Sequence, residues 1–102
     1  MKKILFILLI IFFSNNTFAD DKITLGSEIY KNKAMCGTCH SLQAAKSNGE
    51  IGPNLDRLKP NMEQIIYAVT NGIGVMPGWD GILTPEEIEA VAYFVFNSTS
   101  KE

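Results

Sequence analysis

Two cysteines and a histidine within five consecutive residues constrain this chain more than any other feature. Residues 34–41 read AMCGTCHS, so two residues separate Cys36 from Cys39 and His40 follows directly. The chain has 102 residues, with no other cysteine and no other histidine. A chain of this length forms at most one small domain, and such a domain often needs a staple to supplement a modest core. The motif is the candidate staple.

The N-terminus predicts a leader that is removed from the mature protein. A positive MKK precedes an apolar run at residues 4–13, and the small residues Thr17 and Ala19 follow at the positions that signal peptidases recognise. The run is too short for a membrane anchor, which needs about 20 apolar residues. We therefore expect a signal peptide at residues 1–19, cleaved after Ala19, a domain at residues 20–102, and a periplasmic location.

The charge of the mature chain narrows the classes of partner. Cleavage after Ala19 leaves 83 of the 102 residues, with seven basic and eleven acidic side chains and a net charge of −4. This balance argues against nucleic acid and anionic lipid as partners. We expect a soluble monomer without stable membrane insertion, which meets a protein partner through a basic patch on that partner.

Hydrophobic periodicity and capping signals predict three helices and no paired strands. The first helix is expected at residues 25–35, after a short polar lead at residues 20–24. The second is expected to begin at the N-cap Asn61, with Gln64 completing a capping box, and to end at Asn71 and Gly72. A third is expected to begin at the N-cap Thr84, with Pro85 next and Glu87 completing a capping box. Because we expect helices, no paired strands and glycine-rich connecting loops, the predicted fold class is all-α.

The cysteine pair has three chemical interpretations. A redox disulfide of the C-x-x-C type belongs to a strand–helix–strand context, which this sequence lacks. Structural zinc needs four ligands, whereas the chain offers two cysteines and one histidine. The pattern C-x-x-C-H is also the signature of covalent haem attachment, in which two thiols add to the vinyl groups and the adjacent histidine becomes the axial ligand of the iron. This third interpretation, haem c bound covalently through Cys36 and Cys39, is the prediction.

Elimination indicates the second axial ligand. His40 cannot pair with another histidine, and methionine is the common alternative. Met1 leaves with the leader, Met35 is too close to Cys36 to reach the opposite face, and Met62 falls on the apolar face of the second helix. Met76 lies in the loop GIGVMPGW, where Gly72 and Gly74 allow a close approach to a flat ligand. The predicted metal ligands are therefore His40 and Met76.

With these residues in place, the chain resembles the class I cytochromes c over nearly all of its mature length, and more closely the short bacterial and algal members. The resemblance implies N- and C-terminal helices that cross, with loops wrapped around one covalent haem. It places Gly26 and Tyr30 at that crossing, opposite Val91 and Phe94. By the same resemblance, the carbonyl of Pro53 accepts a hydrogen bond from His40 and Leu55 packs on the haem. Trp79 is expected to pack near the haem, with a role in partner docking as the less favoured alternative.

The predicted function is one-electron transfer between redox proteins such as a terminal oxidase, a reductase or a dehydrogenase. Two filled axial positions leave no open site for a substrate, which argues against an enzyme. A haem-based ligand sensor or minor peroxidase with a displaceable Met76 is the alternative. A tethered subunit of a larger oxidase or dehydrogenase is a further variant.

Overall fold

Helices form most of the computed structural model, which describes residues 17–100. The long elements are α2 (Thr17–Glu28), which continues into the π-helical segment η3 (Ile29–Lys33), α4 (Met62–Asn71) and α5 (Pro85–Thr99). Short elements lie between them: η4 (Cys36–Thr38), β1 (Ser41–Leu42), η5 (Gln43–Ala45), β2 (Ser47–Asn48) and α3 (Leu55–Leu58). The predicted all-α class is confirmed. No helix within residues 17–100 combines the length and apolarity that crossing a membrane requires.

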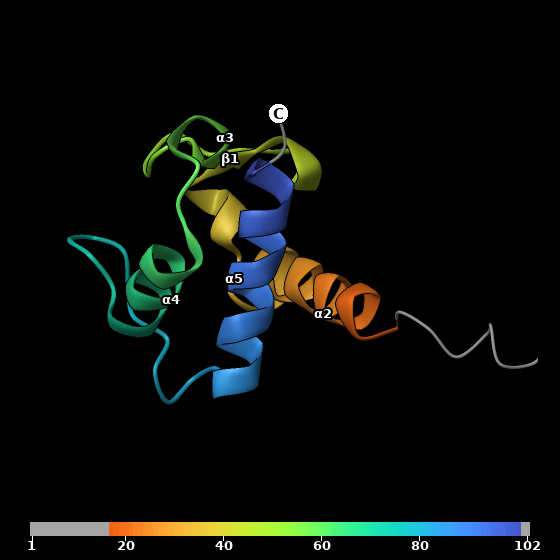
Figure 1. Ribbon diagram of the computed structural model, residues 1–102. Coiled ribbons are helices and arrows are strands. Elements are labelled where there is room, and N and C mark those ends of the chain that lie inside the picture. Colours follow the sequence, from red (N-terminus) through yellow and green to blue (C-terminus); the bar gives the residue numbers. More distant parts are fainter. Residues whose placement is uncertain (1–16, 101–102) are drawn as a thin grey trace, which may run out of the picture.

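The crossing of α2 and α5 organises the core (Figure 1). At Gly26 the two helices approach so closely that a Cβ atom would clash with the carbonyl of Ala90 and with Phe94. One turn later, the ring of Tyr30 meets that of Phe94 edge-on, with centroids 5.7 Å apart. Gly26, Tyr30 and Phe94 therefore lie at the crossing as predicted, while Ala90 rather than Val91 lies against Gly26.

The predicted helix starts at α4 and α5 are confirmed in detail. Asn61 caps α4 and Thr84 caps α5, and in both helices the residue at the third position, Gln64 or Glu87, completes the capping box. The buried residues of these helices are Ile65 and Val69 on α4, and Ile88, Ala90, Val91, Ala92, Phe94, Val95 and Thr99 on α5. Met62 packs against the same core.

Two expectations about secondary structure are wrong. Residues 20–24 are helical and not a polar lead, because α2 begins at Thr17 and Asp20 in its first turn complements the positive end of the helix. Strands are present too: β1 and β2 form an antiparallel pair in which Leu42 lies opposite Ser47. The predicted cleavage point after Ala19 falls within α2. The rest of the predicted signal peptide, residues 1–16, lies outside the described residues.

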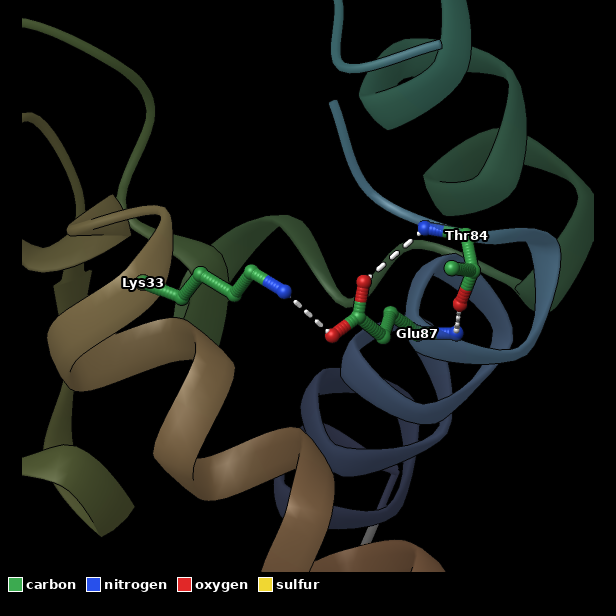
Figure 2. Close-up of polar contacts among 3 residues, drawn as sticks. All are labelled: Lys33, Thr84 and Glu87. Carbon is green, nitrogen blue, oxygen red and sulfur yellow. Dashed lines mark hydrogen bonds and ion pairs between the residues drawn. The ribbon is translucent and has the colours of Figure 1, made fainter. Parts of the chain in front are cut away.

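An ion pair fastens the end of η3 to the start of α5 (Figure 2). The carboxylate of Glu87 accepts a hydrogen bond from the Thr84 amide at 2.9 Å and contacts the Lys33 ammonium at 2.6 Å. Chiefly the hydrogen bond from Lys33, and then that from Thr84, lowers the pKa of Glu87 below its ordinary value. A lowered folded-state pKa stabilises the fold above the unfolded-state pKa, and this stabilisation is lost as the pH falls through the folded-state pKa.

We therefore expect Glu87→Gln to lower the melting temperature slightly at about pH 7, and the difference from wild type to disappear toward about pH 2. Thermal melts across this range measure the effect. Glu86→Gln is the matched control, because Glu86 shares the first turn of α5. A melting difference for Glu87→Gln that does not change with pH contradicts the role given to the ion pair.

Candidate functional site

A cavity of about 650 Å³ lies among η3, η4, α3, α4, the loop at residues 72–82 and α5. All of the predicted site residues line it: Cys36, Cys39, His40, Pro53, Leu55 and Met76. They come from three separate segments of the chain, at residues 36–40, 53–55 and 76, which the fold brings to one place. The volume falls within the range of about 300–1,000 Å³ that is typical of sites for small molecules and cofactors.

Pro53 and Gly52 fix the imidazole of His40 from one side. Nδ1 of His40 lies 2.7 Å from the carbonyl oxygen of Pro53. A carbonyl can only accept, so Nδ1 carries the proton and donates, and Nε2 of the neutral ring is left with its lone pair. A Cβ atom on Gly52 would lie 2.6 Å from Cε1 of this ring, so only glycine lets the loop pass here. The predicted hydrogen bond to Pro53 is thus present.

Cys36 begins the short turn η4 and Cys39 follows as its C-cap, and no disulfide joins them. The amides of Cys39 and His40 both donate to the carbonyl of Cys36, at 3.1 and 3.0 Å, which closes the turn and brings the three side chains to the same cavity. Chiefly burial raises the pKa of the Cys36 thiol to about 11. Before any group is attached, this thiol is therefore uncharged near neutral pH, which suits the apolar wall in which it lies.

A tight turn presents Met76. The amides and carbonyls of Ile73 and Met76 pair reciprocally at 3.1 and 2.8 Å, and Gly72 and Gly74 both have positive φ, at 79° and 57°. Just after this turn, the amide of Trp79 donates to the carbonyl of Val69 at 2.7 Å, which ties the loop to the end of α4. Trp79 packs against the core and lines the cavity, as expected.

The exposed apolar side chains test whether a large prosthetic group fits here. Nine large hydrophobic residues are exposed between residues 17 and 100, and six of them line this cavity: Met35, Ile51, Leu58, Tyr67, Ile73 and Val75. Such a concentration of apolar surface around one hollow indicates a ligand site. Thiol, imidazole and thioether are also the donor types by which haem is attached and ligated in proteins. The residues present therefore fit a haem.

Three residues of the site were not predicted from the sequence. Gly52 had no predicted role, although it backs the His40 ring. Tyr30 was assigned only to the helix crossing, yet it also forms part of the cavity wall. Val75, 88% exposed at the rim, was not singled out at all. The dipeptide Gly52-Pro53 was the available signal for the first, and nothing local marked the other two.

Comparison with known proteins places this arrangement in a family. A family model described as "Cytochrome C oxidase, cbb3-type, subunit III" matches residues 21–95. Cytochrome c6 of Tetradesmus obliquus is 35% identical over 88 residues, which cover 76% of this chain and 92% of that protein. The cbb3-type cytochrome c oxidase subunit FixP of Bradyrhizobium sp. (strain ORS 278) is 40% identical over 76 residues, or 69% of this chain and 25% of that protein.

The fold has a solved counterpart. The crystal structure of the c-type cytochrome SorU from Sinorhizobium meliloti is 51% identical and superposes with a TM-score of 0.73, covering 80% of this chain and 95% of that one. The fold and the cavity define a small helical protein built around a prosthetic group. The chain belongs to the class I cytochromes c with a single haem. Haem c is the cofactor of this family, and Cys36 and Cys39 have the spacing of its attachment motif.

Proposed function

We propose that this protein is an exported one-electron carrier with one haem c, attached through Cys36 and Cys39 and ligated by His40 and Met76. One observation carries the proposal. Two thiols, one imidazole with a free Nε2 and one thioether converge on a single apolar cavity. When bound, the haem supplies an iron that alternates between the ferrous and ferric states.

The chain's own residues have distinct parts in this function. Pro53 holds the His40 ring in one tautomer and increases its basicity, because the carbonyl accepts the Nδ1 proton. Met76, a thioether, favours a high reduction potential. The apolar lining, with Leu55 and Val95 among the buried residues, keeps water from the site. With both axial positions assigned to side chains, no coordination position is left for a substrate.

The relatives support a role among redox proteins. One is named cytochrome c6, and another is named a subunit of a cbb3-type cytochrome c oxidase. We therefore propose an oxidase, a reductase or a dehydrogenase as the class of partner. The leader pattern at residues 1–19 supports export to the periplasm. N-terminal sequencing of the mature protein tests this, and an N-terminus at Met1 would refute it.

Optical spectroscopy and potentiometry of the purified holoprotein test the carrier function. We expect a low-spin ferric spectrum with a far-red sulfur-to-iron band, and a reversible one-electron wave. On a denaturing gel, haem staining should stay with the polypeptide. A high-spin ferric spectrum in the wild type would contradict a closed His/Met site.

A further inference from the structure

A second hollow lies against the wall of the haem cavity. This cleft, of about 440 Å³, is lined by polar and basic residues: Lys31, Thr38, Lys46, Ser47 and Asn48 among them. Tyr30 and Met35 line both the cleft and the haem cavity. Met35 is 59% exposed and Tyr30 only 1%. Tyr30 is therefore the buried part of the partition between the cleft and the haem cavity.

Hydrogen bonds connect this partition to His40. The Tyr30 hydroxyl lies 3.0 Å from Oγ of Ser47, and the Ser47 hydroxyl donates to the carbonyl of His40 at 3.0 Å. A serine hydroxyl has one proton to donate, so Tyr30 must donate to Ser47. The Leu42 carbonyl, 3.5 Å from Oγ of Ser47, is the weaker acceptor. The chain of bonds therefore runs from Tyr30 through Ser47 to the backbone of the proposed axial histidine.

Packing alone does not explain the Tyr30 hydroxyl. The ring meets Phe94 edge-on, and a phenylalanine would make the same contact. A buried hydroxyl without a hydrogen-bond partner destabilises the fold, so the Tyr30 hydroxyl requires Ser47. The hairpin of β1 and β2 supplies that partner, because its register holds Ser47 opposite Leu42. The amide of Gly49, the residue after β2, also donates to the His40 carbonyl, at 3.2 Å, so two donors hold this one carbonyl of His40.

We infer that Tyr30 and Ser47 are positioning residues, which close the wall behind His40 and keep cleft water out of the haem cavity. The inference rests on the proposed function as a one-electron carrier with a bound haem. Water close to the iron stabilises the more highly charged ferric form, so solvent access lowers the reduction potential. The hydrogen-bonded hydroxyls of Tyr30 and Ser47 therefore keep the reduction potential high by excluding water. The Ser47 hydroxyl also fixes the backbone of His40.

The test is potentiometry of holoprotein variants. Ser47→Ala leaves the Tyr30 hydroxyl without its partner, and we expect water to replace the serine. The predicted change is a shift of up to about tenfold toward the ferric form, or about 59 mV. Ser47→Thr retains the hydroxyl and should restore the wild-type potential. Tyr30→Phe should give a smaller shift, because the bond from Ser47 to His40 remains.

The double variant makes the test sharper. In Tyr30→Phe with Ser47→Ala no hydroxyl is stranded, so its potential should lie closer to wild type than that of Ser47→Ala alone. Asn48→Ala, in the same cleft and the same strand, is the matched control and should leave the potential unchanged. Equal potentials for wild type, Ser47→Ala and Asn48→Ala would overturn the inference, even if Ser47→Ala were less stable. A wild type without a reversible potential would instead refute the carrier function itself.

Discussion

Met76→Ala is expected to abolish the far-red sulfur-to-iron band of the ferric protein and to lower its reduction potential. The thioether favours the ferrous state, and its loss also leaves a space that water can enter beside Val75, which is 88% exposed. We expect a decrease of roughly 0.1 V or more, within the range of about 0.8 V over which axial ligands set haem potentials. Absorption spectra and potentiometry of the two proteins measure both effects.

Met62→Ala is the matched control for this prediction. Met62 packs against the core from α4 but does not line the haem cavity, so its truncation should reduce stability while the far-red band stays. The same band in Met76→Ala as in wild type would exclude Met76 as the ligand. A wild type that lacks the band and is high-spin would favour the ligand sensor or peroxidase, in which Met76 is displaced.

The predictable parts of the fold are those with complete local signals. The second and third helices each combine an N-cap residue with a glutamine or glutamate three positions on, and the structure forms both capping boxes. The early start of α2 was missed because its first turns are polar and its register depends on the crossing with α5. The hairpin was missed because two-residue strands are too short to show alternation.

The site divides in the same way. Cys36, Cys39 and His40 follow from one contiguous motif, and Met76 follows from elimination among four methionines. The wall formed by Tyr30 and Ser47 joins residues 17 positions apart through two hydroxyl groups. Their meeting depends on the register of the hairpin and on the left-handed conformation of Met35, with φ 52°, which begins the η4 turn. No local pattern encodes such a juxtaposition.

Replacing both cysteines should have the largest effect on the amount of holoprotein. Without a bound group the cavity of about 650 Å³ leaves the cavity-facing sides of α4 and α5 without a packing partner, so the fold depends on the haem. A ligand at a thousand times its dissociation constant stabilises a fold by about 4 kcal/mol. Because the double variant Cys36→Ser with Cys39→Ser cannot retain the haem covalently, we expect its yield of holoprotein to fall about tenfold or more. Haem staining and immunoblotting of the same samples measure this.

The single variants separate attachment from stability. Cys36→Ser and Cys39→Ser each remove one thiol. The turn is closed by backbone hydrogen bonds to the carbonyl of residue 36, which neither substitution removes, so the backbone of η4 should persist. Each should retain at most one thioether bond and give less holoprotein than wild type. Thr38→Ser, between the two cysteines, should stay at the wild-type level. Wild-type haem staining in all cysteine variants would refute covalent attachment, because no other cysteine exists in the chain to replace these thiols.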